Sequence, residues 1–116
     1  MATKTLTSAE FEELNAASGI TLIDFWAEWC APCRQFAPIF QKASEKHPDI
    51  TFAKVDTEAE QELAMAFGIS SIPTVVAIRD SVIVFQQPGA MPEAMLEKLI
   101  DKVRELDMEK VKAEVA

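Results

Sequence analysis

The sequence predicts an α/β protein whose helices flank one mixed β-sheet, and three observations lead to this fold class. Segments rich in β-branched and aromatic residues alternate with segments whose apolar residues recur at helical spacing. A helix between two strands makes them parallel neighbours, whereas the two-residue Asp80-Ser81 connection indicates an antiparallel hairpin. The length of 116 residues allows one sizeable core. We therefore expect a single domain over residues 1–116, built as a βαβ unit followed by a ββα unit.

The N-terminal segment is predicted to form a short strand and a short helix. The strand is expected near Thr3–Leu6. The run Thr7-Ser8-Ala9-Glu10 has the form of a capping box, in which a hydroxyl and a carboxylate each satisfy a free backbone N–H at a helix start. Gly19 is expected to end this helix, because glycine readily adopts the left-handed conformation found at helix ends.

Two strands and an intervening helix come next. Residues 20–26 (Ile-Thr-Leu-Ile-Asp-Phe-Trp) and 51–56 are rich in β-branched and aromatic residues, which is typical of buried strands. Apolar residues at helical spacing predict a helix between them that ends at about Lys46. Pro38 is expected to kink this helix, because proline removes one backbone donor and crowds the preceding turn.

The second half of the chain is predicted to contain a helix, a hairpin and a last helix. A stripe of apolar residues from Met95 to Leu106 indicates that the last helix packs on the core. The composition of residues 107–116 favours a further helical extension. The other expected elements are a helix over residues 58–67, ended by Gly68, and strands over residues 74–79 and 82–87.

Composition and charge exclude several classes of partner. The chain has 19 acidic residues against 11 basic ones, a formal charge of -8, and would repel both phosphate backbones and anionic lipid. We therefore expect neither nucleic acid nor a membrane surface as partner. The apolar runs of the chain, such as those at 75–78 and 82–85, are far too short to span a membrane. The first residues lack the apolar stretch of a secretory signal, so the expected location is the cytoplasm.

The two cysteines, Cys30 and Cys33, are the main candidates for chemistry. A disulfide that spans two intervening residues hardly constrains the unfolded chain. A structural zinc normally takes four protein ligands, whereas this chain has two cysteines and one histidine in all. A reactive dithiol is the remaining interpretation, with no metal and no bound cofactor expected. An inert buried pair or half of a shared metal site are the alternatives.

The position of the two cysteines suits thiol–disulfide exchange. Pro32 belongs in the first turn of a helix, which places Cys30 at the helix N-terminus. Free amides and the helix dipole there favour a thiolate. Cys33 lies one turn further on the same face, so we expect an exposed attacking sulfur with a resolving sulfur behind it.

Asp24 is a second candidate for chemistry, because it interrupts an otherwise apolar strand. An unpaired carboxylate is costly to bury, and burial raises its pKa towards neutrality. Such a group suits proton transfer at neutral pH, and Asp24 lies only six residues before Cys30. The alternative is that the strand ends early and leaves Asp24 solvated.

The single histidine, His47, is expected to be a solvated helix-terminal residue rather than a catalytic one. A solvated helix face is expected to be formed by Glu58, Glu60 and Glu62.

Six groups of residues occur in an order and at a spacing typical of one family. They are Asp24-Phe25-Trp26-Ala27-Glu28-Trp29-Cys30-Ala31-Pro32-Cys33, Ala37-Pro38, Ala53-Lys54-Val55-Asp56, Gly68-Ile69, Ser71-Ile72-Pro73-Thr74 and Gly89-Ala90. On these residues the chain, from about Thr7 to Leu106, resembles the thioredoxin family. The resemblance implies a thioredoxin fold and a protein disulfide reductase with a reversible Cys30–Cys33 dithiol.

The resemblance also implies roles for further residues. Asp24 would accept the proton of Cys33, and Lys54 would be the partner of that carboxylate, although an ordinary surface lysine is the alternative for Lys54. The Ile72–Pro73 peptide bond would be cis, which places the backbone of Ile72 beside the dithiol. The residues expected to form a small apolar substrate-binding patch around Cys30 are Trp29, Pro32, Ile72, Pro73, Gly89 and Ala90.

The implied partners are disulfide-containing substrate proteins and an NADPH-dependent flavoprotein thioredoxin reductase, with the chain itself a monomer. Ala31 and Ser81 stand where the family commonly has glycine, and Pro88 is a further local change. Oxidising relatives carry a histidine between the cysteines that stabilises the thiolate, so the neutral Ala31-Pro32 pair favours a reductant. Two alternatives stay open, a redox-independent binding subunit of a larger assembly and a disulfide oxidase or isomerase.

Overall fold

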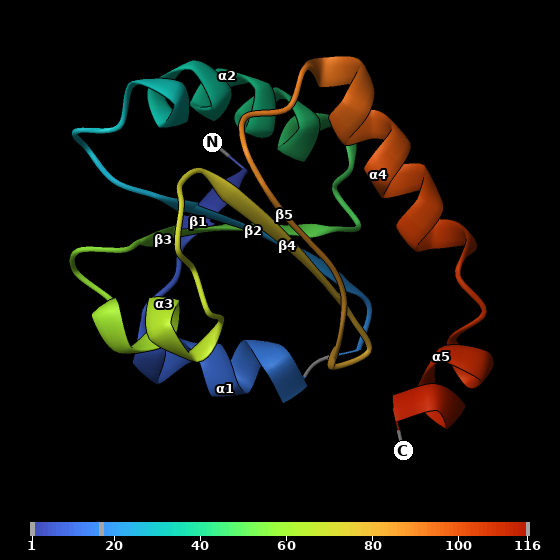
Figure 1. Ribbon diagram of the computed structural model, residues 1–116. Helices are drawn as coiled ribbons and strands as arrows, with labels where there is room; N and C mark the ends of the chain where they lie inside the picture. Colours follow the sequence, from blue (N-terminus) through green and yellow to red (C-terminus); the bar gives the residue numbers. More distant parts are fainter. Residues whose placement is uncertain (1, 17, 116) are drawn as a thin grey trace.

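A five-stranded mixed sheet forms the centre of the computed structural model, which describes residues 2–16 and 18–115 (Figure 1). The strand order is β1-β3-β2-β4-β5. The strands are β1 (Thr3–Thr5), β2 (Ile20–Trp26), β3 (Thr51–Asp56), β4 (Thr74–Arg79) and β5 (Val82–Pro88). The first three in this order pair in parallel, and β4 and β5 are antiparallel to their neighbours, as the sequence predicts.

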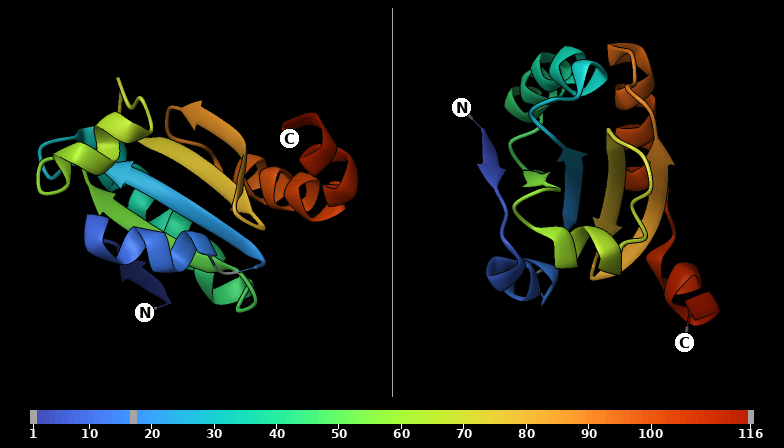
Figure 2. Two further views of the ribbon diagram at one scale, coloured as in Figure 1. Left: turned by 90° about the horizontal axis from the view of Figure 1, so that it is seen from below. Right: turned by 60° about the vertical axis from the view of Figure 1, so that its left-hand side comes forward.

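Helices cover both faces of this sheet (Figure 1, Figure 2). The helices are α1 (Ser8–Ala16), α2 (Ala31–Lys46), α3 (Gln61–Ala66), α4 (Glu93–Glu105) and α5 (Met108–Val115). One core lies between the sheet and α2 and α4, and the other lies between the sheet and α1 and α3. No helix in the described part of the chain has the length and apolar content to cross a membrane.

Strand β2 contributes to both cores because alternate side chains of a strand point to opposite faces. Leu22 belongs to the core under α2 and α4, whereas Ile23 and Phe25 belong to the core under α1 and α3. Asp24 alternates with Ile23 and Phe25, and therefore shares the face of Leu22. The carboxylate is thus on the side of the sheet that α2 covers.

Two helices begin or end at residues other than those predicted. Helix α1 ends at Ala16 rather than at Gly19, whose N–H instead donates to Asp80 Oδ1 at 2.9 Å. Helix α3 begins at Gln61 rather than at residue 58. The cause is Asp56, whose Oδ1 accepts the N–H of Glu58 at 2.9 Å and stabilises a turn in front of the helix.

The start of α1 also differs from a capping box. The Thr7 hydroxyl donates to the Glu10 carboxylate at 2.9 Å instead of each group bonding a backbone N–H. The N–H of Ser8 finds its acceptor far along the chain, in Glu60 Oε1 at 2.8 Å. Glu60 therefore ties α1 to the segment before α3, and is not simply part of a solvated face.

The last two helices follow the prediction with one exception. Leu96, Leu99, Ile100 and Val103 of α4 are buried, but Met95 is 47% exposed and lies outside the core. Helix α5 spans Met108–Val115 and buries Met108. It also approaches the β4–β5 hairpin, where Lys112 Nζ lies 3.8 Å from Asp80 Oδ2.

The hairpin turn accommodates Ser81 through its backbone geometry. Asp80 and Ser81 have φ values of 51° and 69°, the pair of positive angles that a type I′ turn requires. The Ser81 hydroxyl donates to the carbonyl of Asn15, which offsets part of the cost of this conformation. Arg79, just before the turn, donates from Nη1 to the carbonyls of Val103, Arg104 and Leu106 at 2.8 to 3.1 Å.

His47 is less solvated than expected. It follows the last residue of α2, but only 17% of its side chain is exposed. Its Nε2 lies 2.8 Å from Glu97 Oε1, and Arg104 Nη2 lies 3.0 Å from Nδ1. Arg104 also forms an ion pair with Asp49. His47 therefore joins the end of α2 to α4 and is distant in the fold from the cysteines.

Candidate active site

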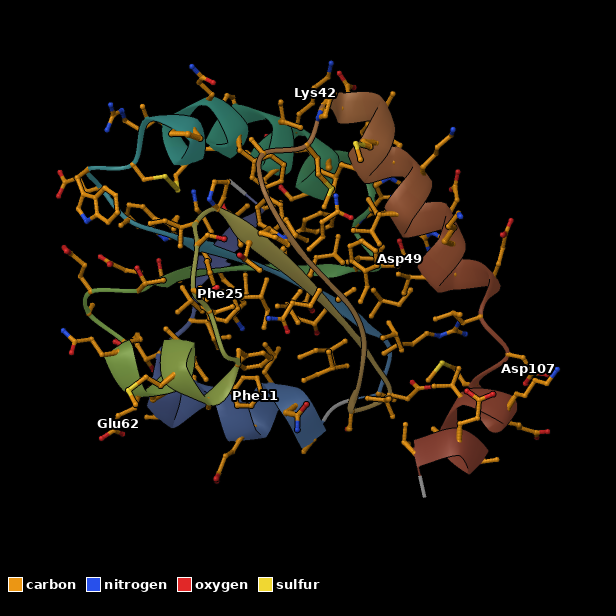
Figure 3. All side chains as sticks on the ribbon, viewed as in Figure 1. Phe11, Phe25, Lys42, Asp49, Glu62 and Asp107 are labelled. Carbon is orange, nitrogen blue, oxygen red and sulfur yellow. A yellow bond between two sulfur atoms is a disulfide. The ribbon has the colours of Figure 1, made fainter. Side chains whose placement is uncertain are left out.

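The two cysteines form a disulfide at the N-terminal end of α2, where Figure 3 shows a bond between two sulfur atoms. Cys30 is the residue that caps the helix, and Cys33 lies in its first turn, with a Cα–Cα distance of 5.2 Å. Pro32 occupies the first turn as predicted, where its missing N–H leaves no hydrogen bond unmade. The strand β2 ends at Trp26, just before this turn.

The start of the helix directs a hydrogen bond at the first sulfur. The N–H of Cys33 donates to Cys30 Sγ at 3.2 Å. In the reduced protein the same N–H and the helix dipole favour a thiolate at Cys30. Cys30 is more buried than expected, since only 4% of it is exposed, and Cys33 is 2% exposed. Access to the disulfide is therefore narrow and depends on the residues around it.

A loop that precedes β4 forms one wall beside the cysteines. The peptide bond between Ile72 and Pro73 is cis, which agrees with what the resemblance implies. The Ile72 carbonyl oxygen lies 3.7 Å from Cys30 Sγ, and the side chains of Ile72 and Trp26 pack against the cysteines. The loop thus brings a backbone carbonyl next to the sulfur at the helix end.

Two hydrogen bonds hold this loop. The N–H of Gly89 donates to the Pro73 carbonyl at 2.7 Å, with Gly89 at a φ of 101°, a conformation that favours glycine. The Thr74 hydroxyl, which is buried, donates to the Ser71 carbonyl at 2.6 Å and so spans Ile72 and Pro73. The sequence analysis gave no role to the Thr74 hydroxyl, because the sequence does not reveal that it bonds the carbonyl three residues before it.

Asp24 is completely buried, which excludes the alternative of an early strand end. Burial raises the pKa of Asp24 to about 6, although the positive charge of Lys54 acts in the opposite direction. The two residues are paired in register on β2 and β3, with Lys54 Nζ 3.7 Å from Asp24 Oδ2. Within the described residues, neither carboxylate oxygen has a hydrogen-bond partner. Asp24 is therefore an acid that changes protonation state near neutral pH.

Lys54 is not an ordinary surface lysine. Its side chain is 23% exposed, and its Nζ lies 5.2 Å from the centre of the Trp26 ring, within range of a cation–π interaction. Trp26 in turn packs against the cysteines. Lys54 and Asp24 thus contact each other behind the residues that surround the disulfide.

The residues expected to bind substrate differ in exposure. Trp29 is 66% exposed, and its indole N–H donates to Glu58 Oε1 at 3.0 Å. Ile72 is half-buried and Pro73 is buried, whereas Pro32, Gly89 and Ala90 are exposed. The contact of Glu58 with Trp29 was not predicted, because it joins positions 29 residues apart. In the described part of the chain, no three His, Cys, Asp or Glu side chains are arranged to hold a metal ion.

Comparison with known proteins agrees with this geometry. A sequence model of the family described as Thioredoxin matches residues 2–102. The chain belongs to the thioredoxin family. It is 55% identical over 111 residues to "Putative thioredoxin 2" of Streptomyces coelicolor, an alignment that covers 96% of this chain and 83% of that protein. It is 40% identical over 97 residues to "Thioredoxin" of Alicyclobacillus acidocaldarius, covering 83% and 92%.

Solved thioredoxin structures have the same fold. A thioredoxin of Plasmodium falciparum superimposes with a TM-score of 0.80 at 32% identity, over 85% of this chain and 97% of that one. A mutant thioredoxin of Halobacterium salinarum gives 0.83 at 30% identity, over 90% and 92%. Thioredoxins are protein-disulfide oxidoreductases, and this chain is a thiol–disulfide reductase of that family. Neither the binding-subunit alternative nor the isomerase alternative receives support from these comparisons.

Proposed function

We propose that Cys30 is the attacking cysteine of this reductase. In the reduced protein its thiolate attacks one sulfur of a substrate disulfide, forms a mixed disulfide and releases the other substrate sulfur as a thiolate. The support is the hydrogen bond from the Cys33 N–H to Cys30 Sγ, together with the position of Cys30 at the start of α2. Both features stabilise negative charge on this sulfur before and during the attack.

Cys33 then resolves the mixed disulfide. Asp24 accepts the proton of the Cys33 thiol, and the resulting thiolate attacks Cys30 Sγ and releases the second substrate thiolate. Two electrons pass in this way from the dithiol to the substrate. A carboxylate whose pKa is about 6 is well suited to this transfer, because it is mostly ionised at neutral pH yet basic enough to take a proton. Lys54 keeps the ionised form accessible by opposing the effect of burial.

The substrate contacts the small apolar patch around Cys30. This patch consists of Trp29, Pro32, Ile72, Pro73, Gly89 and Ala90. The Ile72 backbone is beside the sulfur, where an extended substrate segment can add to it in the manner of a β-strand. The bond from the Gly89 N–H to the Pro73 carbonyl joins two parts of this patch.

The oxidised protein returns to the dithiol through an NADPH-dependent flavoprotein thioredoxin reductase. The protein acts in the cytoplasm as a monomer and binds no cofactor of its own. Ala31 and Pro32, between the cysteines, add no charge that would stabilise the thiolate further. The pair therefore remains a good reductant rather than an oxidant.

The N–H bond to Cys30 Sγ carries this proposal, and trapping experiments test it. The Cys33→Ser variant should accumulate a mixed disulfide with a substrate protein, visible by mass spectrometry, because attack proceeds and resolution does not. The Cys30→Ser variant should accumulate none. A mixed disulfide at Cys33 in the Cys30→Ser variant, with none at Cys30 in the Cys33→Ser variant, would reverse the assignment. Redox equilibration of the wild type with glutathione buffers tests the reductant assignment, and a potential near or above that of the glutathione pool would contradict it.

A further inference from the structure

Arg34 bonds the chain on both sides of Trp29, and we propose that it is a positioning residue that holds Trp29 and Cys30 in place for the attack on substrate disulfides. The proposal rests on the proposed function, since it requires Cys30 to be the sulfur that reacts with substrates. It gives a role to a charged residue directly after Cys33 that the proposed mechanism does not use.

Cys30 ends a tight turn between β2 and α2. Its N–H donates to the carbonyl of Ala27 at 3.2 Å, so Glu28 and Trp29 occupy the two central positions of the turn. Neither of these two residues has a positive φ, which excludes a type II turn, because that turn needs a positive φ at its second central residue. The direction of the peptide group between Glu28 and Trp29 is therefore a defining feature of this turn.

Arg34 holds that peptide group from the first turn of α2. Its Nη1 donates to the Glu28 carbonyl at 2.7 Å, a short distance that is typical of a charged donor. Its backbone N–H donates to the Cys30 carbonyl at 3.2 Å. One residue of α2 thus bonds both the residue before Trp29 and the residue after it.

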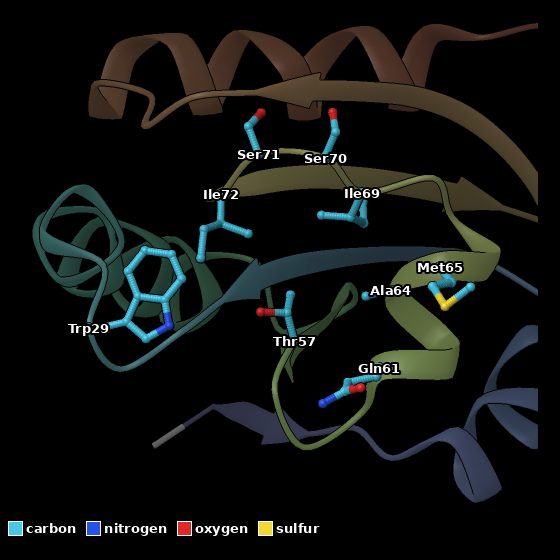
Figure 4. A pocket seen from close by; sticks show the side chains of 9 residues that line it. All are labelled: Trp29, Thr57, Gln61, Ala64, Met65, Ile69, Ser70, Ser71 and Ile72. Carbon is cyan, nitrogen blue, oxygen red and sulfur yellow. The ribbon is translucent and has the colours of Figure 1, made fainter.

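Packing alone does not hold the Trp29 ring. Trp29 is 66% exposed and borders a pocket of about 490 Å³, whose other walls include Ile72 and residues of α3 (Figure 4). An exposed side chain with open space beside it changes rotamer on a fast timescale unless hydrogen bonds restrain it. The bond to Glu58 restrains the ring, and the bond from Arg34 restrains the backbone that carries the ring.

This restraint affects protein substrates more than small disulfides. A substrate chain contacts the apolar patch that includes Trp29 while its disulfide meets Cys30, so the patch and the sulfur need a fixed relative position before the attack. A small disulfide without neighbouring residues needs only the sulfur. Loss of the Arg34 bond should therefore slow exchange with peptides and leave exchange with small disulfides unchanged.

Single-turnover oxidation of the reduced protein tests this proposal. The probes are the symmetric disulfide of a short capped peptide, with alanine on both sides of its cysteine, and hydroxyethyl disulfide. The loss of protein thiols is followed by alkylation and mass spectrometry. Arg34→Met, which removes the donors, should slow the reaction with the peptide about fivefold and leave the reaction with hydroxyethyl disulfide unchanged. Arg34→Lys should keep most of the peptide rate, because one bond to a carbonyl requires a single charged donor rather than the whole guanidinium group.

NMR relaxation of the oxidised protein supplies a second measurement. The order parameters of the backbone amide and the indole N–H of Trp29 should fall in Arg34→Met and be retained in Arg34→Lys. The control is Lys42→Met, which removes a positive charge from an exposed position of the same helix. It should change neither the two rates nor the order parameters.

The outcomes separate the role of Arg34 from that of the cysteines. Equal slowing of both probes by Arg34→Met would assign the effect to the charge near the thiolate. An unchanged peptide rate, unchanged order at Trp29, or the same loss in Arg34→Lys as in Arg34→Met would show that the bond to Glu28 does not position the turn. Each of these results overturns the role of Arg34 while the reductase proposal stands. Failure of the reduced wild type to react with hydroxyethyl disulfide would instead overturn the proposed roles of the cysteines, and the positioning proposal with them.

Discussion

Asp24 and Lys54 are direct register partners on β2 and β3, but their charged atoms stop 3.7 Å apart, beyond the length of a hydrogen bond. The carboxylate is completely buried, whereas the ammonium group is partly exposed and also faces the Trp26 ring. The pair is therefore too loose to hold Asp24 fully ionised. Burial prevails over the attraction, and the acid titrates at about pH 6.

Replacement of Asp24 by asparagine should stabilise the protein in a pH-dependent way. The folded-state pKa of about 6 lies above the ordinary 3.8, so the protonated acid is favoured by folding. The stability that the protonated Asp24 gives to the fold is fully present below about pH 4 and is lost as the pH rises through 6. Relative to wild type, Asp24→Asn should gain about 2 kcal/mol in the free energy of unfolding between pH 4 and pH 8. Urea unfolding of the oxidised proteins measures it. Asp101→Asn, on the exposed face of α4, is the control, and a gain for Asp24→Asn that is the same at both pH values contradicts the prediction.

Removal of the Lys54 charge should raise the pKa of Asp24 further. Lys54 is the group whose charge lowers this pKa, so Lys54→Met leaves the effect of burial unopposed. Titration of the Asp24 carboxyl carbon by NMR in the oxidised protein measures the change. Lys98→Met, on an exposed position of α4, should leave the pKa where it is. An unchanged or lower pKa in Lys54→Met would show that the two charges do not interact.

Thr74→Val should disturb the loop that carries Ile72. The substitution keeps the shape of the side chain but leaves the Ser71 carbonyl without the hydroxyl that lies 2.6 Å away. We expect a loss of about 1–3 kcal/mol in the free energy of unfolding. The rate at which peptide disulfides oxidise the reduced protein should also fall more than the rate at which hydroxyethyl disulfide does. Thr74→Ser, which retains the hydroxyl, should keep both properties close to those of the wild type. A Thr74→Val variant with the stability and reactivity of the wild type would contradict the prediction.

Arg79→Met should loosen the end of α4 and the start of the C-terminal extension. Its guanidinium contacts three carbonyls, those of Val103, Arg104 and Leu106, at the point where α4 ends. We expect a loss of about 1–2 kcal/mol in urea unfolding, since this charged donor is partly solvated. Amides of α5 should exchange with solvent faster. Lys102→Met, an exposed lysine in the last turn of α4, is the control and should change neither quantity. Unaltered exchange in Arg79→Met would show that the contacts of Arg79 do not hold α5 in place.

Much of the fold could be predicted because its signals are local. The bounds of β2, β3 and β4 agree with the predictions, since the pattern of β-branched and aromatic residues ends abruptly at each strand end. The predicted start of α3 was wrong, because the Asp56 carboxylate accepts a hydrogen bond from the N–H of Glu58 and stabilises a turn there. The spacing of apolar residues does not reveal such a bond. The predicted packing of Met95 on the core was wrong, because this residue lies at the edge of the apolar stripe of α4. Helical spacing cannot separate core from surface there.

Part of the site could likewise be predicted from local signals. The spacing of Cys30 and Cys33 indicated the dithiol, and a charged residue within an apolar strand indicated the burial of Asp24. The partner of Trp29 is Glu58 and the partner of the Ser71 carbonyl is Thr74, and neither contact can be read from periodicity. The pocket beside Trp29 is still less predictable, because it forms where α3 and the loop after it meet the loop after β2. Such contacts depend on how the loops converge once the sheet has formed.

The disulfide joins two residues of a single helical turn, only three positions apart, and ties no separate parts of the fold together. Opening or closing this bond therefore neither releases nor joins separate helices or strands. A partner that distinguishes the reduced from the oxidised protein must therefore contact the atoms around Cys30 directly. Recognition of the redox state and the exchange reaction then take place on the same small surface.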